Sequence, residues 1–407
     1  MRTEFLSQAP WLDEERVIGY ARIFACLYLV MAIAWIALSP NLIDPNGKPL
    51  GTDFMDVWAA GKLALAGEPA AAYDYARHYE VQRHALPYAE GQEAPYFGWP
   101  YPPHFMLVAA ALALLPYGAA LAAWMALTLP VYLAAVRAAM PHRNWLLFAL
   151  AFPGVFVNLG HGQNGFLSVG LLGLGLLSLE ERPILAGVFF GLLTYKPQLG
   201  LLLPLALIVD SRWCAFLAAT ATALFVSLLS YVVLGAETWH AFFASFELTR
   251  TYVLEQGPTG WQKLQSPFAA MRMLGAGIEA AYAVQAAVSL FVAAVVLWIW
   301  RRPLAMPLKG AALATGTLLV TPYVLDYDLM LLAIPLAWLA MEGIRGQFLS
   351  WEKISLFAAW LLPLVSRGIG SLGLPIGPIV LLLLLVLIMR RAVVEAPSLR
   401  SPAAEMA

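Results

Sequence analysis

Two aspartates three residues apart, Asp53 and Asp56, stand in the run Gly51-Thr-Asp-Phe-Met-Asp-Val-Trp58. If a short helix begins there, this spacing puts both carboxylates on one helical face. A carboxylate held beside a substrate hydroxyl and shielded from bulk water can act as a general base. Either residue could instead cap the helix by accepting a backbone N–H, and the residue types alone favour that role.

A polar turn rich in glycine, Asn158-Leu-Gly-His-Gly-Gln-Asn-Gly165, joins two apolar runs. Glycines let the backbone turn sharply and approach a ligand closely. His161, Gln163 and Asn164 add neutral hydrogen-bonding groups that could hold such a ligand. The alternative is a helix cap followed by an ordinary turn, and the composition does not decide between the two.

A single lysine, Lys196, lies at a proline break in the run Thr194-Tyr-Lys-Pro-Gln198. Because Pro197 interrupts the helix, it frees backbone polar groups, and a cation beside them would suit a phosphate. Lys196 and Gln198 are therefore the candidate phosphate ligands. A lysine at the end of a membrane helix can also simply extend its ammonium group to the membrane surface.

Two further aspartates, Asp326 and Asp328, flank Tyr327 in the run Thr321-Pro-Tyr-Val-Leu-Asp-Tyr-Asp328. Such a pair can hold a divalent metal through its oxygens. Two carboxylates are a thin ligand shell, however. Hydrogen bonding to a sugar, or to a nearby lysine or arginine, is therefore favoured over metal binding.

The elements that position these residues must be membrane helices. Of the 407 residues, 61% are apolar and 12% charged, about half the charged fraction of a usual globular protein. This composition cannot give a soluble protein its polar surface, and a net charge of −1 leaves no basic footprint for nucleic acid. Cys26 and Cys214 lie within apolar runs and are expected to be small buried residues.

Runs of about twenty apolar residues can span a bilayer as helices, because a helix satisfies its own backbone polar groups. Such runs predict an all-α polytopic membrane protein with about twelve transmembrane helices. They lie near 17–38, 118–139, 145–159, 165–180, 184–195, 197–209, 213–234, 281–301, 308–322, 327–342, 354–369 and 374–390. The shorter run from His104 to Leu115 predicts a re-entrant or interfacial helix, and Gly187-Val-Phe-Phe-Gly191 indicates close helix packing.

Basic residues collect in short cytoplasmic loops, and this rule orients the chain. It predicts a cytoplasmic N-terminus and tail and places the four polar motifs on the periplasmic side. The predicted order is N-terminus 1–16, first transmembrane helix 17–38, periplasmic loop with interfacial or re-entrant helices 39–117, transmembrane helices 118–234, second periplasmic loop 235–280, transmembrane helices 281–390 and tail 391–407.

The segment from Ser39 to Pro103 holds eight of the twenty-five acidic residues and ten aromatic ones. Carboxylates can bind the hydroxyls of a carbohydrate, and aromatic faces can bind its C–H edges. Contacts to a sugar or an acceptor are predicted for Asp56, Trp58, His161, Gln163, Asn164, Gln265, Asp326, Tyr327 and Asp328. His78 and His84 have no obvious partner in this segment and are expected to be solvated.

Several of these motifs occur together in a known family. The run Gly160-His-Gly-Gln-Asn-Gly165, followed by Ala186-Gly-Val-Phe-Phe-Gly-Leu-Leu-Thr-Tyr-Lys-Pro-Gln198, resembles the bacterial polyprenyl-phosphate-sugar-dependent enzymes of glycosyltransferase family 87. The archetype of that family is a mannosyltransferase with the GT-C fold. The same pattern includes Asp53, Gly67-Glu-Pro69, Tyr73-Asp74, Tyr101-Pro-Pro103, Gln265-Ser266 and Thr321-Pro322, so the resemblance extends over about residues 50 to 330.

The resemblance implies a GT-C bundle in the bacterial inner membrane, a sugar donor on polyprenyl phosphate, and a lipid or glycan acceptor that approaches from the periplasm. Asp53 would be the general base, the anomeric configuration would invert, and Lys196 would stabilise the leaving phosphate. No metal or other cofactor is expected. Where the family often has a Trp-x-His-His-like run, this chain has Leu325-Asp-Tyr-Asp328, so mannose is only the default donor sugar.

The alternative function is a transporter or flippase for a lipid-linked sugar. A transporter would place charged groups near the middle of the bilayer. Here the candidate residues gather on one predicted side, and a transporter also leaves the long polar segment after the first span without a role. The sequence therefore favours the enzyme.

Overall fold

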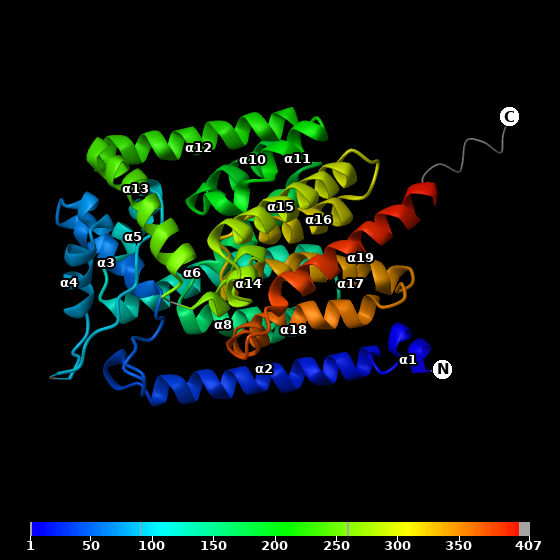
Figure 1. The fold of residues 1–407 in the computed structure, drawn as a ribbon, viewed down its shortest axis with the longest axis horizontal. Coiled ribbons are helices and arrows are strands. Elements are labelled where there is room, and N and C mark those ends of the chain that lie inside the picture. The colour runs from blue at the N-terminus through cyan, green and yellow to red at the C-terminus, as the bar shows by residue number, and fades with distance from the viewer. Residues whose placement is uncertain (1, 90, 259, 399–407) are drawn as a thin grey trace.

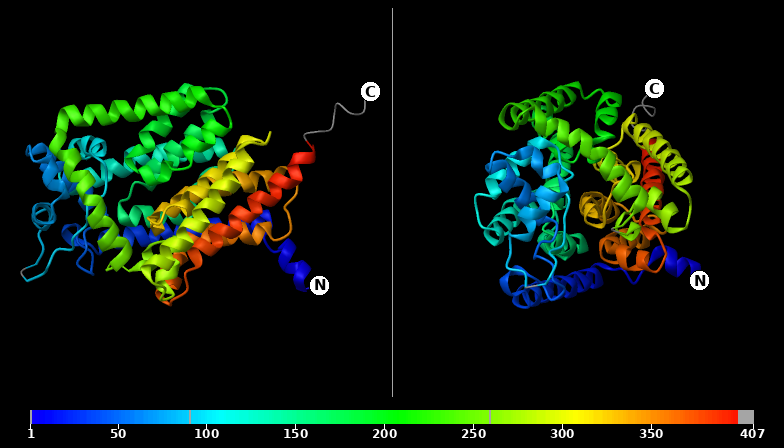
Figure 2. Two further views of the ribbon diagram at one scale, coloured as in Figure 1. Left: turned by 45° about the horizontal axis from the view of Figure 1, so that its top comes forward. Right: turned by 60° about the vertical axis from the view of Figure 1, so that its left-hand side comes forward.

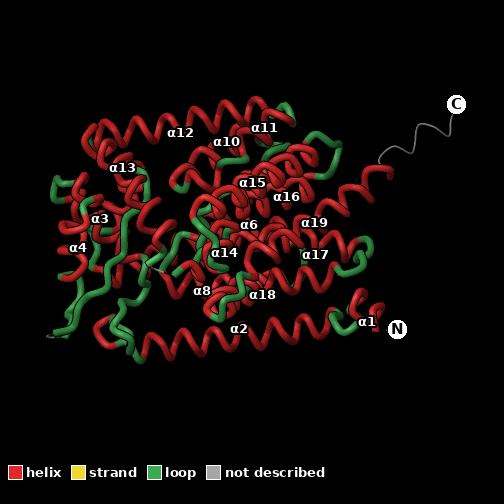
Figure 3. The backbone as a smooth tube through the Cα atoms, viewed as in Figure 1, coloured by secondary structure: helices red, strands yellow, loops and turns green. Residues whose placement is uncertain are grey.

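The protein is a bundle of helices in the computed structural model, which describes residues 2–89, 91–258 and 260–398 (Figure 1; Figure 3). Within those ranges the chain forms no β-strand, and its only extended pairings are two isolated bridges, Ile43 to Pro49 and Leu264 to Leu325. The predicted all-α class is confirmed.

Seven helical segments of the described chain are long and apolar enough to cross a membrane. They are α2 (Glu14–Ala37), α6 (Tyr117–Ala139), α12 (Trp213–Leu234), α15 (Ile278–Trp300), η7 with α17 (Asp326–Leu332 and Ala333–Arg345), α18 (Glu352–Ser371) and α19 (Ile376–Ser398). This confirms a polytopic membrane protein.

Shorter apolar helices occupy the other predicted spans, several of them broken at prolines. They are α7 (Trp145–Ala151), α8 (Pro153–His161), α9 (Gly165–Ser178), α10 (Pro183–Leu192), η3 (Leu193–Tyr195), η4 (Pro197–Gly200), α11 (Leu203–Val209) and α16 (Met306–Val320). Proline lacks the N–H that continues a helix, which explains the breaks at Pro153 and Pro197. The number of about twelve spans stays a prediction, as does the membrane side of each loop.

The segment after the first span folds into short helices at one end of the bundle, on the left of Figure 1. The first and last described residues both lie at the opposite end. The short elements of the chain are α1 (Arg2–Gln8), η1 (Pro40–Leu42), α3 (Phe54–Leu65), η2 (Pro69–Tyr73), α4 (Tyr75–Arg83), α5 (Pro103–Leu112), α13 (Ala236–Leu248), the π-helix η5 (Thr249–Gln256), η6 (Trp261–Lys263) and α14 (Pro267–Met273). The expected short helix after Pro103 is therefore present as α5.

Burial separates the centre of the bundle from its surface. In the η7–α17 segment 83% of the most apolar window is buried, against 6% in α12 and 17% in α2. The segment that carries Asp326 and Asp328 is therefore central, and other helices surround it (Figure 2). The expectation that Cys26 and Cys214 are buried is wrong, because both lie on the exposed surfaces of α2 and α12.

Close packing between α10 and α12 depends on the two glycines of the predicted packing motif. A Cβ atom on Gly187 would lie 2.5 Å from the backbone oxygen of Ala215, and one on Gly191 would lie 2.5 Å from the Cβ of Thr222. Small residues allow membrane helices to approach this closely. The predicted packing role is confirmed.

This contact predicts the outcome of adding one methyl group. Gly187→Ala should lower the stability of the detergent-solubilised protein by about 1–3 kcal/mol, because the new methyl overpacks the α10–α12 contact. Gly19→Ala is the matched control, since Gly19 has open space around it on α2. Thermal unfolding would measure both variants, and equal midpoints for the two would contradict the packing role.

Candidate active site

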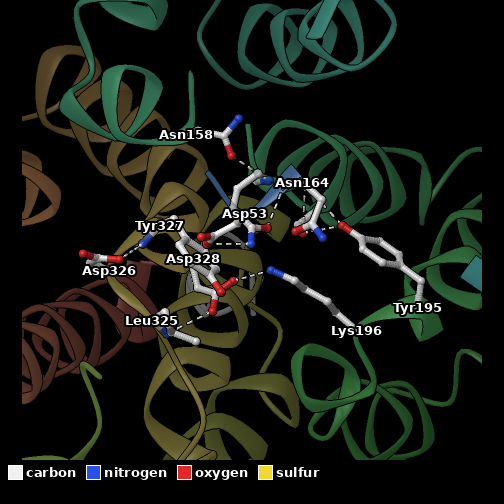
Figure 4. A network of polar contacts seen from close by, with 12 residues as sticks. Asp53, Asn158, Asn164, Tyr195, Lys196, Leu325, Asp326, Tyr327 and Asp328 are labelled. Carbon is white, nitrogen blue, oxygen red and sulfur yellow. Dashed lines mark hydrogen bonds and ion pairs between the residues drawn. The ribbon is translucent and has the colours of Figure 1, made fainter. Parts of the chain in front are cut away.

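The four polar motifs found in the sequence lie together beside the first loop. Asp53 precedes α3, Asn164 precedes α9, Lys196 lies between η3 and η4, and Asp328 lies in η7. Figure 4 shows these side chains in one cluster, with the Lys196 ammonium group directed at Asp328. Segments far apart in the chain thus build one polar site.

Gly162 makes the approach of the first loop possible. It has a φ of +62°, and a Cβ atom there would lie 2.8 Å from the Cβ of Phe54. Because only glycine takes this conformation without strain and without a clash, the turn can touch the loop. The Asp53 N–H then donates a hydrogen bond to the carbonyl oxygen of His161 over 3.0 Å. The polar turn is both a helix end and part of the site.

The Asp53 carboxylate is held by the same turn. Gln163 donates a hydrogen bond from Nε2 to Oδ2 over 3.1 Å, and Thr52 donates one from Oγ1 to Oδ1 over 3.4 Å. Nδ1 of His161 lies 3.7 Å from Oδ1. Asp53 makes no side-chain capping bond to α3, so the capping alternative is wrong for this residue. Its side chain keeps 22% exposure and can still be reached by a substrate.

Asp53 is ionised at neutral pH. Burial would raise the pKa of its carboxyl, but the hydrogen bond and positive charge of His161, with smaller effects of Gln163 and Lys263, hold the pKa below its ordinary value. Donors and nearby cations stabilise the charged form of a carboxyl. An ionised, partly accessible carboxylate can accept a proton.

The surroundings of Asp56 disfavour the charged form of its carboxyl, unlike those of Asp53. It is buried in α3, and its Oδ1 has no hydrogen-bond partner among the described residues. Burial, and next the charge of Asp53, raise its pKa well above the ordinary value. A carboxyl in that setting holds its proton to a higher pH than Asp53 does, and its protonated form can donate a hydrogen bond. The two aspartates of the motif therefore differ in how readily they ionise.

His78 is not solvated, contrary to the expectation from the sequence. It is fully buried in α4, with Nε2 3.2 Å from the backbone carbonyl oxygen of Asp56 and a further contact to Gln82. Burial lowers its pKa to about 4, so the imidazole is neutral. Its polar partners lie in α3 and one turn further along α4. The sequence around His78 does not show that α4 packs against α3, so these partners could not be predicted from it. His78 supports the position of α3.

Tyr101 links the polar turn to the first loop. Its hydroxyl donates to Oε1 of Gln163 over 3.3 Å and accepts from Nδ2 of Asn164 over 2.8 Å. The hydroxyl of Tyr195 donates to the backbone oxygen of Asn164 over 3.2 Å. Neither tyrosine was among the predicted site residues. The signal for Tyr101 was its place in the acidic, aromatic segment.

Lys196 is buried and paired with Asp328. The Nζ to Oδ1 distance is 2.6 Å, and the two side chains are 3% and 2% exposed. Nζ also lies 5.0 Å from the centre of the Tyr327 ring. The sequence offered a sugar, or a nearby lysine or arginine, as partners for this aspartate, and the structure shows the lysine. Lys196 does not extend to the surface, so that alternative is wrong.

Two cations at the site were not predicted. Nη1 of Arg367 in α18 lies 3.7 Å from Oδ2 of Asp326. Lys263 in η6 is close enough to Asp53 to affect its pKa. The described residues contain no group of three or more histidine, cysteine or acidic side chains placed to hold a metal. A charged residue inside an apolar span, such as Arg367, is the sequence signal that could have shown this cation.

Three predicted residues stand apart from the Asp53 contacts. Trp58 is buried, and its indole N–H donates to the backbone oxygen of Leu115 over 3.0 Å. Gln265 is buried and donates from Nε2 to the backbone oxygen of Gln262 over 3.0 Å. Gln198 lies in η4 next to the lysine, without a hydrogen bond to the described site residues. Their predicted contacts to a sugar, an acceptor or a phosphate stay predictions.

The apolar helices of membrane length and the buried polar side chains among them define the class, an integral membrane protein with a candidate catalytic centre. A comparison with protein families gives the chemistry. Residues 99–322, more than half of the chain, match the model of glycosyltransferase family 87. The chain belongs to this family and is a glycosyltransferase, as the resemblance predicted.

No curated protein and no solved structure matches the chain. The matched range includes the polar turn, Lys196 and Gln265. It leaves out Asp53 and the aspartates of η7. Their connection to the family region therefore rests on the contacts described above.

The buried ion pair predicts a strong coupling between two substitutions. Lys196→Met should destabilise the protein by about 3–5 kcal/mol, because it leaves the Asp328 charge buried without a partner. Asp328→Asn should cost stability for the same reason. In the double variant the two costs should partly cancel, since neither charge is left alone. Thermal unfolding of all four proteins measures the coupling, and strictly additive losses would refute it.

Proposed function

We propose that this glycosyltransferase moves a hexose from a polyprenyl-phosphate donor to a hydroxyl of a lipid or glycan acceptor, with Asp53 as the general base. The observation that carries the proposal is the ionised Asp53 carboxylate, reachable from outside and fixed by the polar turn of the family region. Such a carboxylate can remove the proton of an acceptor hydroxyl as that oxygen attacks the sugar.

The carboxyls at the site support a single displacement. Asp53 would take the hydroxyl proton, the acceptor oxygen would bond to the anomeric carbon, and the bond from that carbon to the phosphate oxygen would break. The electron pair of the broken bond would leave with the phosphate. Retention through a covalent glycosyl-enzyme would need a second accessible carboxylate, yet the side chains of Asp56, Asp326 and Asp328 are all buried. We therefore infer inversion at the anomeric carbon.

Lys196 is the proposed stabiliser of the leaving phosphate, with Gln198 beside it. A fixed cation in a site shielded from water stabilises charge that develops in the transition state. The buried position of Lys196 supports this role, because few water molecules compete for it. The donor phosphate would share the ammonium group with Asp328, whose carboxylate accepts a second hydrogen bond from the Leu325 N–H.

The orientation of the chain supports a periplasmic site in the bacterial inner membrane. Both described chain ends lie at the end of the bundle opposite to α3 and α4. If the N-terminus and the tail are cytoplasmic, as the basic residues predict, the site faces the periplasm. Mannose is the default donor sugar, and no cofactor is part of the proposal. The family match favours sugar transfer over the transport of a lipid-linked sugar.

The test of this function uses purified protein, a synthetic polyprenyl-phosphate hexose and lipid acceptors. Asp53→Asn should lower the turnover number by about 10²–10⁴-fold, the usual contribution of a general base. Asp44→Asn is the matched control, because Asp44 lies in the same loop and only accepts hydrogen bonds from the N–H groups of Asn46 and Lys48. Mass spectrometry of the acceptor measures transfer. Equal rates for the wild type and Asp53→Asn would show that the base is another group.

A further inference from the structure

A cavity of about 330 Å³ lies between α2, α6, α7, α17 and α18, outside the site described above. This volume is at the lower end of the range of ligand pockets, roughly 300–1,000 Å³. Most of the lining is apolar, and its buried part includes Phe152, Ala333 and Leu336. The hydroxyl of Tyr132, also in the lining, already donates to the backbone oxygen of Ala149 over 2.9 Å. The interior therefore suits a hydrocarbon chain.

One side of the cavity can be reached from the surface of the bundle. Val17 and Tyr20 of α2 line it and are 37% and 38% exposed. Both belong to the first turns of a helix that is long and apolar enough to span a membrane, so the surface that they form faces lipid. A lipid chain can therefore enter the cavity from the membrane.

Charged side chains line the cavity where two of its helices begin. Among the described lining residues the charged ones are Asp13, Glu14 and Lys353. Asp13 caps α2, Glu14 is the first residue of that helix, and Lys353 is the second residue of α18. These helix ends lie at the end of the bundle that carries the N-terminus (Figure 1). Both signs of charge thus occur at the mouth of an apolar cavity.

The cation at this mouth is not neutralised by an acid. Among the described residues Lys353 has no hydrogen bond or ion pair, and its Nζ lies 5.3 Å from the centre of the Phe348 ring. The neighbouring acid, Glu352, is fully buried and accepts a hydrogen bond from Nη2 of Arg391 over 2.7 Å. The start of α18 has no side-chain cap either, and a helix N-terminus favours negative charge. Lys353 and this helix end together favour an anionic group.

The two acids at the mouth are still open to a cation. Oε1 of Glu14 lies 3.5 Å from Nη2 of Arg143 and 3.7 Å from Nε2 of His142, and the Glu14 side chain is 61% exposed. Asp13 is 49% exposed, and its Oδ2 lies 3.6 Å from Nε of Arg16. Exposed ion pairs of this length are weak. An ammonium group can therefore compete for both carboxylates.

The mouth of the cavity is distant from the candidate active site. Glu14 begins α2, whereas Trp35, near the other end of α2, lies beside the polar turn, because a Cβ atom on Gly160 would be 3.5 Å from its ring. With a rise of 1.5 Å per residue, about 30 Å of helix separates Glu14 from Trp35. A lipid whose phosphate is held at this mouth cannot place that phosphate at Lys196, so it is not the sugar donor.

We propose that the cavity binds one hydrocarbon chain of a glycerophospholipid with an ammonium headgroup, such as phosphatidylethanolamine. The phosphate of this lipid lies at Lys353 and the start of α18, and its ammonium group lies at Asp13 and Glu14. A headgroup with both charges complements the mouth better than one with a negative charge alone. If the N-terminus is cytoplasmic, as the basic residues predict, the lipid belongs to the cytoplasmic leaflet.

The chain of the lipid fills space behind the active site. Phe152 directly precedes α8, which ends at the polar turn, and Ala333 directly follows η7, which carries Asp326 and Asp328. Filling an apolar cavity stabilises the side chains around it. The lipid would therefore support the two segments that hold the site, without contact to the substrates.

The experiment measures lipid binding to the full-length protein, stripped of lipid in a maltoside detergent, by native mass spectrometry. Phosphatidylethanolamine is compared with phosphatidylglycerol, which lacks the ammonium group, and with diacylglycerol, which lacks the headgroup, all with the same acyl chains. Lys353→Gln removes the cation. Asp13→Asn combined with Glu14→Gln removes the acids, and asparagine can still cap α2. Ala340→Leu adds bulk to the lining of the cavity.

Two matched variants are the controls. Arg250→Gln removes an exposed cation that pairs with Glu247 elsewhere on the chain. Ala221→Leu adds the same bulk as Ala340→Leu, on the exposed surface of α12. Both should bind the three lipids as the wild type does.

The wild type should bind phosphatidylethanolamine roughly tenfold or more tightly than diacylglycerol, as expected for hydrogen bonds between charged groups. Lys353→Gln should lose this preference. The variant without the two acids should still prefer phospholipids to diacylglycerol but should no longer distinguish the two phospholipids. Ala340→Leu should lower the occupancy of phosphatidylethanolamine, because less space is left for its chain.

Equal binding of phosphatidylethanolamine and diacylglycerol by the wild type would overturn the headgroup site. Equal binding of the two phospholipids would overturn the ammonium assignment. Lys353→Gln guards against misfolding, because it breaks no hydrogen bond or ion pair of a described residue. If this variant keeps both its thermal midpoint and the full preference of the wild type, the lipid is not bound at this mouth. None of these results depends on sugar transfer.

Discussion

The hydrogen bonds between Asp53 and the polar turn connect the first loop to the membrane bundle, and the site depends on them. The N–H of Asp53 is bound by the carbonyl of His161, and its carboxylate is bound by Gln163. Gly162 allows both contacts because no other residue fits its conformation and its space. Without this junction no hydrogen bond would hold the base beside the polar turn. With it, the base is fixed beside the turn and near the buried lysine.

Low polarity imposes a second constraint on the same site. Charges are costly where water is scarce, so each must be paired, stabilised by donors or neutralised by a proton. Asp53 is stabilised by donors, Asp328 is paired with Lys196, and burial raises the pKa of Asp56 so that this carboxyl holds its proton more firmly. These three solutions give three carboxyls different chemistry, although all belong to one residue type. The division leaves Asp53 as the ionised carboxylate that a substrate can approach.

Much of the fold and part of the site could be predicted from the sequence. Apolar runs gave the membrane helices, because backbone polar groups in lipid leave few alternatives to a helix. The motif residues Asp53, Gln163, Asn164, Lys196 and Asp328 do come together. The sequence could not show that Lys196 and Asp328 pair, since 132 positions separate them. It also missed Tyr101, Lys263 and Arg367, whose roles depend on which helices pack against each other.

Errors in the prediction have the same origin. His78 was expected in water because its neighbours in the chain are polar, yet α4 turns it against α3. The two cysteines were expected in the core because their neighbours are apolar, yet in a membrane protein apolar surface can face lipid. The composition around a residue does not show whether it faces water, lipid or the protein interior, because the packing of the helices decides which side it faces. The run Leu325-Asp-Tyr-Asp328 is a further example. Its two aspartates lie beside Arg367 and Lys196, which are distant in the sequence.

The central claim is a single displacement with Asp53 as the base, and the anomeric configuration of the product tests it most directly. A donor of known configuration would be turned over by the purified enzyme, and NMR of the product would give the configuration of the new linkage. The account predicts inversion, because a glycosyl-enzyme would need a second accessible carboxylate and the other carboxyls of the site, on Asp56, Asp326 and Asp328, are buried. Retention of configuration would contradict it.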